Sequence, residues 1–198
     1  RCGIGNAAIL AHAFAGLLGP GHPRLRLLAQ HAALSAFRRP AAERKGKAPM
    51  RLWIGEEEVD DVYPRFARVK LSAEPVIDIS GASGVPLLVA LATGADWRGH
   101  APGPNGLPGG YPLQLRDGQL DLDLPAGLDR SQAVAWNAAF EEANGVVVGA
   151  DGRVRYTGRV EAVLRRASPD LAAGFRVAEF DAAYDALLGL RAKLMAAG

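Results

Sequence analysis

The sequence predicts a mixed α/β or α+β fold, in which helices pack on a mixed sheet that contains antiparallel hairpins. Helix-like and strand-like segments alternate through the first half of the chain, and two hairpin patterns with Asp-Gly turns follow in the second half. The 198 residues, 49% of them hydrophobic, are enough for one core of ordinary size, so we expect residues 1–198 to form a single domain. Because the chain opens with Arg1-Cys2-Gly3 and no initiator Met, we expect it to be a fragment of a longer parent chain.

The first half of the chain predicts helices and short strands in turn. Asn6 is suited to cap a first helix, which Gly19-Pro20-Gly21 would stop. A sharp turn at 80–84 should lead into an apolar helix that Gly94 ends. The predicted helices are 6–18, 32–39 and 85–93, and the predicted strands are 25–29, 50–54, 69–71 and 76–79.

The second half of the chain contains the clearest local signals. Asp117-Gly118 is typical of a type I′ turn, and the alternating leucines around it predict a hairpin of 113–116 with 119–124. Asp129 and Gln132 have the spacing of a capping box at the start of a helix that Gly145 would end. A second hairpin of 146–148 with 153–156 and helices over 159–167 and 177–197, separated by Ser168-Pro169, complete the prediction.

Composition and charge exclude several classes of function. A net charge of +2, with no aromatic residues among the basic ones, argues against binding to nucleic acid. No apolar run reaches the length of a membrane span. The single cysteine, Cys2, cannot form an internal disulfide and favours a cytoplasmic protein. The four histidines show no metal-ligand spacing, so we expect no metal; His12 is interpreted as a packed helix residue and His22 as an exposed one.

The glycine-rich loop at residues 99–112 is the strongest candidate for the rim of a site. Nine of its fourteen residues are Gly or Pro, which predicts a shaped loop without helix or strand. The titration range of His100 suits acid–base catalysis, although a structural hydrogen bond is the favoured interpretation. Tyr111 could transfer a proton or could fill space under the loop as an aromatic plug, and Asn105 could bind a substrate.

Two glycine patterns earlier in the chain suggest binding of anions. Gly3-Ile4-Gly5-Asn6-Ala7-Ala8 fits the G-x-G-x-x-A turn of dinucleotide-binding units, in which a helix N-terminus faces a pyrophosphate; a tight helix entry is the alternative. The turn at 80–84 could hold an anion through free N–H groups, with Ser83 contacting the substrate. Ser83 does not fit the G-x-S-x-G pattern of an acyl-transfer nucleophile, because the second glycine is misplaced.

The stretches 79–88 and 103–112 together resemble the downstream half of saccharopine- or opine-dehydrogenase-like oxidoreductases. This resemblance, over roughly residues 3–124, implies an α/β domain that receives the substrate and often pairs subunits, beside a nucleotide-binding domain. It implies NAD or NADP as cofactor, which Gly3, Gly5 and Asn6 would contact, and a homodimer.

The resulting hypothesis is a substrate-binding or catalytic domain of an NAD(P)-dependent oxidoreductase acting on an amino-acid-like or 2-oxo-acid-like small molecule. In this hypothesis Ser83 and Asn105 orient the anionic group of the substrate, and His100 or Tyr111 handles the proton. The alternative is a non-enzymatic α/β module that uses the 99–112 loop to contact a partner chain.

Overall fold

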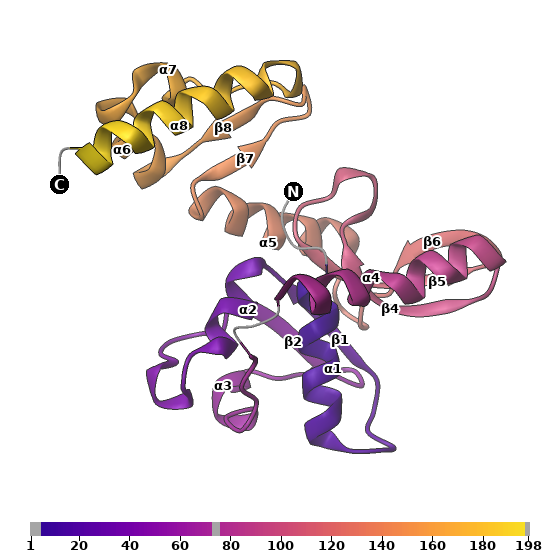
Figure 1. The fold of residues 1–198 in the computed structure, drawn as a ribbon. Coiled ribbons are helices and arrows are strands. Elements are labelled where there is room, and N and C mark those ends of the chain that lie inside the picture. Colours follow the sequence, from indigo (N-terminus) through magenta and orange to yellow (C-terminus); the bar gives the residue numbers. More distant parts are fainter. Residues whose placement is uncertain (1–4, 73–75, 197–198) are drawn as a thin grey trace. The chain divides into compact units, whose positions relative to one another are not determined.

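The computed structural model describes residues 5–72 and 76–196, and the chain divides into two compact units, residues 1–137 and 138–198 (Figure 1). The predicted fold class is confirmed, because helices cover a sheet whose strand pairs are all antiparallel. Unit 1 contains α1 (Asn6–Leu18), β1 (Leu25–Ala29), α2 (His31–Arg38), β2 (Met50–Ile54), β3 (Glu57–Glu58), α3 (Val62–Arg65), α4 (Val76–Thr93), β4 (Trp97–Pro102), β5 (Gly110–Arg116), β6 (Gln119–Leu122), and the 3-10 turns η1 (Ala41–Glu43) and η2 (Pro104–Gly106).

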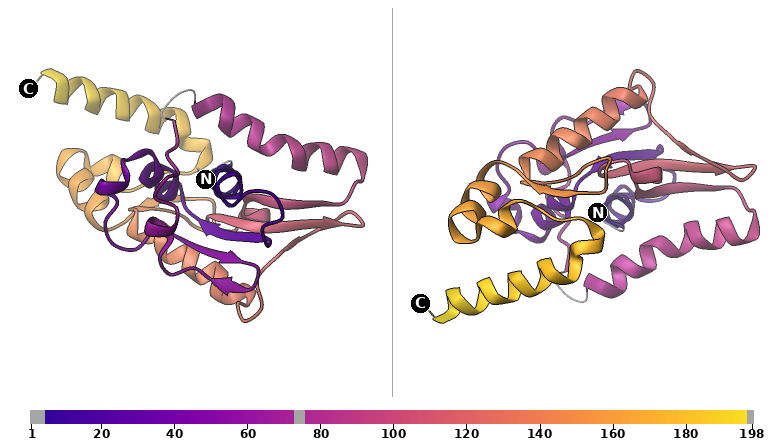
Figure 2. Two further views of the ribbon diagram at one scale, coloured as in Figure 1. Left: turned by 90° about the horizontal axis from the view of Figure 1, so that it is seen from below. Right: turned by 90° about the horizontal axis from the view of Figure 1, so that it is seen from above.

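The sheet of unit 1 runs β3-β2-β1-β5-β4, and β6 pairs with β5 beside this path. Helices α1 and α4 lie on one face of the sheet, and α5 (Arg130–Ala143), which begins in unit 1, lies on the other (Figure 2). Each face has its own core. Leu27 of β1 packs against α1 together with Leu10 and Phe14, whereas Leu28 packs on the opposite face with Ala133 of α5. The alternation along β1 thus separates two apolar layers.

The predicted strands at 69–71 and 76–79 and the turn at 80–84 are wrong. Val76 to Thr93 form one helix, α4, and residues 69–71 belong to no strand. No strand of the described sheet pairs with residues 76–79. A helix satisfies its backbone hydrogen bonds without a partner strand, and this requirement outweighs the β-branched composition that suggested a strand.

The prediction that the 99–112 loop contains neither helix nor strand is also wrong. Residues up to Pro102 belong to β4, residues from Gly110 belong to β5, and only the segment between them turns. Pro102 is tolerated because it ends β4, which is an edge strand. Pro112 lies opposite His100 within the β4–β5 ladder. The Gly- and Pro-rich stretch therefore forms the turn of the β4–β5 hairpin and the strand residues on either side of that turn.

Several local predictions are confirmed in detail. Asp117 and Gly118 have φ angles of 48° and 74°, as a type I′ turn requires at both positions. Asp129 Oδ1 accepts a hydrogen bond from the N–H of Gln132 at 2.8 Å, and Gln132 Oε1 accepts one from the N–H of Asp129 at 3.1 Å. The expected N-cap is shifted by one residue, because Gly5 occupies the cap with a φ of 84° and Asn6 begins α1 without a capping side-chain bond.

Unit 2 continues α5 and adds a small hairpin with helices. Its elements are β7 (Val146–Val148), β8 (Val154–Tyr156), α6 (Gly158–Ala167), α7 (Pro169–Ala172), η3 (Val177–Glu179) and α8 (Phe180–Ala196). The hairpin and the helices agree with the predicted segments to within a few residues. Phe175 forms an isolated antiparallel bridge with Val154, which joins the chain before α8 to the hairpin.

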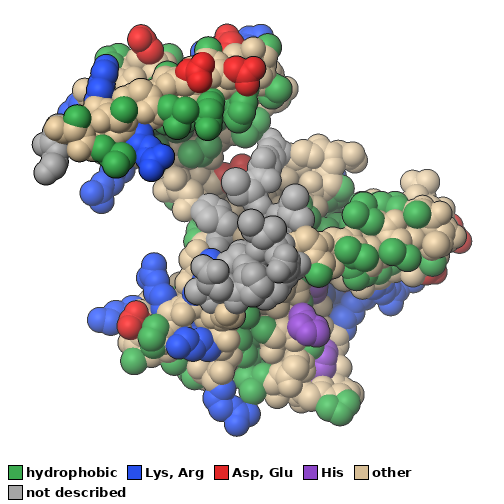
Figure 3. Space-filling view, in the orientation of Figure 1, with side chains coloured by type: hydrophobic (Ala, Val, Ile, Leu, Met, Phe, Trp, Pro, Cys, Tyr) green, Lys and Arg blue, Asp and Glu red, His purple; other side chains and the backbone are tan. Residues whose placement is uncertain are grey.

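Exposed apolar side chains gather along α4 and α8, as the green surface of those two helices shows (Figure 3). On α4, Val85, Leu88 and Val89 are 50%, 65% and 53% exposed, and Ala90 is the one buried residue among its described side chains. Soluble proteins rarely leave such a continuous apolar strip uncovered. The strip on α4 is therefore a candidate interaction surface.

Candidate functional site

The sheet register places the two residues predicted to handle protons on opposite faces. Tyr111 lies opposite Ala101, and His100 lies opposite Pro112 in the β4–β5 ladder. Because successive side chains of a strand point to opposite faces, His100 faces α1 and Tyr111 faces α5. Tyr111 is 0% exposed within the core that includes Leu113 and Ala133. The two residues do not share a pocket, and Tyr111 lies where the aromatic-plug interpretation places it.

The two residues predicted to bind substrate lie apart from His100. Ser83 is a half-buried residue within α4, because the turn expected at 80–84 is helical. Asn105 is exposed in η2, where its φ of 51° is left-handed. Neither residue lines the pocket that contains His100. The wall expected from the 80–84 turn is not formed.

The predicted cofactor-binding residues precede α1. Gly3 lies outside the described residues. Gly5 adopts a left-handed conformation and its carbonyl accepts the N–H of Ile9 at 2.7 Å, so the first hydrogen bond of α1 begins here. Asn6 is 8% exposed and has no acidic neighbour in the first turn of the helix. Phosphate groups bind at such helix N-termini in other proteins, whereas Gly5, Asn6 and Ala7 are buried here.

A gap in the sheet lies beside β5. Gly110 pairs with Ala29 of β1, while residues 113–116 pair with β6 along the same edge. The N–H of Asp123 donates to the carbonyl of Pro112 at 2.9 Å, so the carbonyl of Pro112 points to this edge. The ring nitrogen of a strand proline points to the same side as its carbonyl, and Pro112 therefore removes no ladder bond to β4. The gap lies where β1 ends its pairing and β6 begins.

His100 supplies a hydrogen-bond acceptor inside this gap. The Arg24 carbonyl accepts the N–H of Gly55 toward β2, so the N–H of Leu27, three residues later, points the other way, toward β5. That N–H donates to Nε2 of His100 at 3.0 Å. Because Nε2 accepts, the neutral imidazole carries its proton on Nδ1. Burial and, to a lesser extent, the charge of Arg24 lower the pKa of His100 to about 4.

The imidazole lines a pocket of about 340 Å³ between α1, the start of β1 and β4. His100 itself is only 8% exposed. Among the described residues none hydrogen-bonds Nδ1. Histidine side chains also appear on the surface of unit 1 in the space-filling view (purple in Figure 3). The pocket is lined by Ala11, His12, Ala15, His22, Arg24, Leu25, Arg98, Gly99, His100 and Asp123.

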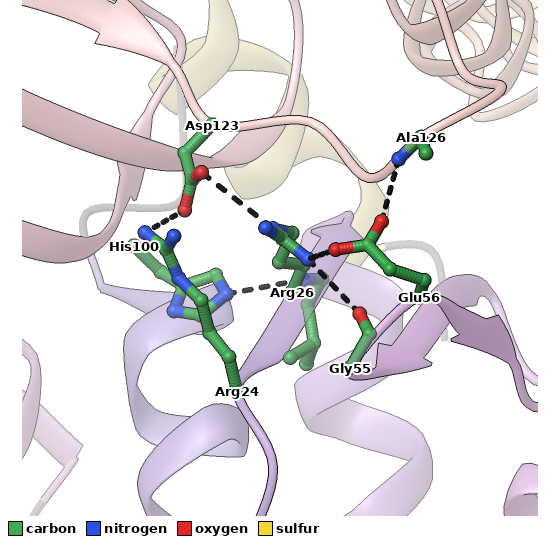
Figure 4. Close-up of polar contacts among 8 residues, drawn as sticks. Arg24, Arg26, Gly55, Glu56, His100, Asp123 and Ala126 are labelled. Carbon is green, nitrogen blue, oxygen red and sulfur yellow. Dashed lines mark hydrogen bonds and ion pairs between the residues drawn. The ribbon is translucent and has the colours of Figure 1, made fainter.

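A network of ion pairs lies beside the pocket (Figure 4), and two of its members, Arg24 and Asp123, line it. Asp123, directly after β6, pairs with the guanidinium of Arg24, and its other oxygen lies 3.5 Å from Nε of Arg26. Arg26 Nη1 donates to Glu56 at 2.8 Å, and Glu56 accepts the N–H of Ala126 at 2.7 Å. This N–H and then Arg26 lower the pKa of Glu56. The two arginines and the two carboxylates thus balance one another in charge.

Arg98 contributes a cation that this network does not neutralise. It lies two residues before His100 on the same face of β4, and its side chain is exposed at the pocket. No described acidic side chain forms an ion pair with it. With Arg24 and Asp123 paired, the uncompensated charge of the pocket is positive. Such a pocket attracts a small anion.

Sequence reasoning found His100 but missed Arg24, Arg98 and Asp123. The missed residues lie in three separate segments that only the sheet pairing brings together. One local signal was present. Arg98 and His100 alternate along a strand, which places both on one face, but the strand was hidden because the stretch from residue 99 was interpreted as a loop.

Within residues 5–72 and 76–196, no three histidine, cysteine or acidic side chains are grouped as metal ligands. No helix within those ranges combines the length and apolarity needed to span a membrane.

Comparison with known proteins identifies no family for the chain. The chain matches no family model, no curated protein and no solved structure.

Proposed function

We propose that unit 1 is the substrate-binding domain of an NAD(P)-dependent oxidoreductase, and that its pocket binds a small amino-acid-like or 2-oxo-acid-like carboxylate. The observation that carries the binding part is the guanidinium of Arg98, which forms no ion pair with any described residue, beside the buried donor of His100 in one pocket. A volume of about 340 Å³ is at the lower end for ligand pockets and suits a small acid rather than a dinucleotide.

The redox part of the proposal rests on the resemblance of residues 79–88 and 103–112 to the saccharopine- and opine-dehydrogenase-like enzymes. Gly5 and Asn6, at the start of α1, would hold a phosphate of NAD or NADP through backbone N–H groups. The nicotinamide would supply hydride transfer. The chain's own residues would position the acid: Arg98 would bind the carboxylate and His100 would donate a hydrogen bond.

Calorimetric titration tests the binding part. Pyruvate serves as the probe, because it is a small carboxylate with a 2-oxo group. Arg98→Gln should weaken its binding at least tenfold, since a charge-assisted hydrogen bond to a carboxylate is lost. Arg116→Gln is the matched control, because Arg116 is an exposed arginine at the far end of β5 that does not line the pocket. Equal losses in both variants would mean that only overall charge matters.

Fluorescence titration tests the cofactor part separately. NADH and NADPH should quench the tryptophan emission of the chain, and replacing Gly5 by Val should abolish the effect, because a side chain is strained at a φ of 84° and crowds the phosphate. Gly19→Val is the control, since Gly19 has a φ of 82° with open space around it. Emission that stays unchanged with both nucleotides would remove the cofactor from the proposal.

The alternative function is an interaction module, and the observation that favours it is the exposed strip of Val85, Leu88 and Val89 on α4. This surface takes the place of the 99–112 loop in that interpretation. For either function we propose that the chain forms a homo-oligomer through α4. Light scattering at a protein concentration of roughly tens of micromolar should show a dimer. Leu88→Glu should dissociate this dimer, whereas Thr93→Glu, a control at an exposed position of the same helix, should leave it intact.

A further inference from the structure

The charges around the pocket are arranged unfavourably for an ammonium group. Arg24 and Arg98 line the pocket, and Asp123 is the one carboxylate among its lining residues. Asp123 is already engaged by Arg24 and lies near Arg26 as well. An α-ammonium group would therefore add a positive charge beside two guanidinium groups with no free carboxylate to receive it. A neutral substituent on the α-carbon avoids this repulsion.

His100 presents only a hydrogen-bond donor to the pocket. Nε2 of His100 is occupied by the N–H of Leu27 at 3.0 Å, which leaves Nδ1–H as the free end of the ring. With a pKa of about 4, the ring stays neutral at pH 7.5. A carbonyl oxygen can accept from Nδ1–H, whereas an ammonium group, which only donates, finds no acceptor there. An ammonium group bound in the pocket would displace the water that can accept from Nδ1–H and would leave this donor without a partner, which costs free energy.

We propose that this pocket selects 2-oxo acids over the corresponding amino acids. Arg98 binds the carboxylate, and Nδ1–H of His100 donates to the 2-oxo oxygen. Arg98 and His100 are two residues apart on one face of β4, so their Cα atoms lie roughly 7 Å apart, and the long arginine side chain can meet a carboxylate next to the carbonyl that the imidazole contacts. This selectivity rests on the proposed carboxylate pocket, and it narrows the substrate class of that same site.

Three acids with the same three-carbon skeleton, pyruvate, propionate and L-alanine, distinguish the proposed selectivity for 2-oxo acids from the binding of carboxylates in general. They share the carboxylate and differ at the α-carbon, which carries a carbonyl, only hydrogens, or an ammonium group. Calorimetry at pH 7.5 should give the highest affinity for pyruvate and a several-fold lower affinity for propionate. The affinity for L-alanine should be at least tenfold lower than that for pyruvate.

The possible results have distinct meanings. Equal binding of all three acids would overturn the selectivity and leave the carboxylate pocket standing. Tighter binding of L-alanine than of pyruvate would overturn it as well. If none of the three acids binds at concentrations up to roughly tens of millimolar, the proposed carboxylate pocket itself is overturned.

A spectroscopic measurement in the unmutated chain tests the donor directly, and a variant is needed only to assign the signal. In ¹⁵N-histidine-labelled protein, long-range ¹H–¹⁵N spectra should show His100 protonated on Nδ1, and pyruvate, but not propionate, should shift that nitrogen. His100→Gln assigns the signal, and it preserves an acceptor for Leu27 and a donor for the ligand. A His100 protonated on Nε2, or a shift identical with both acids, would overturn the proposed contact.

Discussion

Gly109 occupies a position where both backbone and packing require glycine. Its φ is 73°, and a Cβ added there would overlap the side-chain amides of Asn137 and Gln30. These amides are not free to move aside. Gln30 Nε2 donates to Asn137 Oδ1 at 2.6 Å, and both residues are buried between β1 and α5. A methyl group at 109 must therefore break the hydrogen bond that fixes α5 on the sheet.

We predict that Gly109→Ala destabilises unit 1 by about 2–5 kcal/mol. A left-handed conformation costs an alanine about 1–2 kcal/mol, and leaving buried amide groups unsatisfied costs about 1–3 kcal/mol more. Gly118→Ala is the matched control, because Gly118 has a φ of 74° and no atom within 4 Å of the added Cβ. It should lose only the conformational part, about 1–2 kcal/mol.

Urea unfolding followed by tryptophan fluorescence measures this difference. The three tryptophans Trp53, Trp97 and Trp136 all belong to the core on the α5 face of unit 1, so their emission reports the unit in which Gly109 lies. The two variants should share one m-value and differ in midpoint. Equal midpoints for Gly109→Ala and Gly118→Ala would refute the reasoning, because the packing contribution would then be absent.

Two further predictions concern the charged groups of the gap. The pKa of His100 is about 4 in the folded chain and about 6.5 in the unfolded chain, so the unfolded chain binds more protons between these pH values. The free energy of unfolding should therefore fall by up to about 3 kcal/mol as the pH drops from 6.5 to 4. Urea midpoints across that range should fall less for His100→Gln, and parallel profiles would contradict the assignment. Asp123→Asn should cost about 1–3 kcal/mol, because Arg24 and Arg26 lose their shared carboxylate. Thermal melts should show Arg24→Gln recovering part of this loss in the double variant, and purely additive losses would mean that the pair is not coupled.

Elements whose signals lie within a few adjacent residues could be predicted from the sequence alone. The Asp117-Gly118 turn, the Asp129–Gln132 capping box and the helix stop at Gly94 are fixed by left-handed backbone angles and side-chain caps, which depend on no distant contact. The first helix and the strand after it were predicted with the boundaries that the structure shows.

Segments that depend on partners were predicted less well. Residues 76–79 have the composition of a strand, but no strand of the described sheet pairs with them, and they begin the helix α4. Residues 99–112 have the composition of a loop, yet the pairing of β4 with β5 continues into both ends of that stretch. Backbone hydrogen bonding between distant segments decided both cases, and composition carries no information about it.

The candidate site was decided mostly by tertiary structure. The sequence alone singled out His100 as a candidate site residue, but it could not tell that the register turns Tyr111 to the opposite face. It also gave no sign that Asp123 would meet Arg24 across the gap between β1 and β6. A site built at a gap in a sheet depends on which strands pair and where their pairing stops, and those are contacts between residues far apart in the chain.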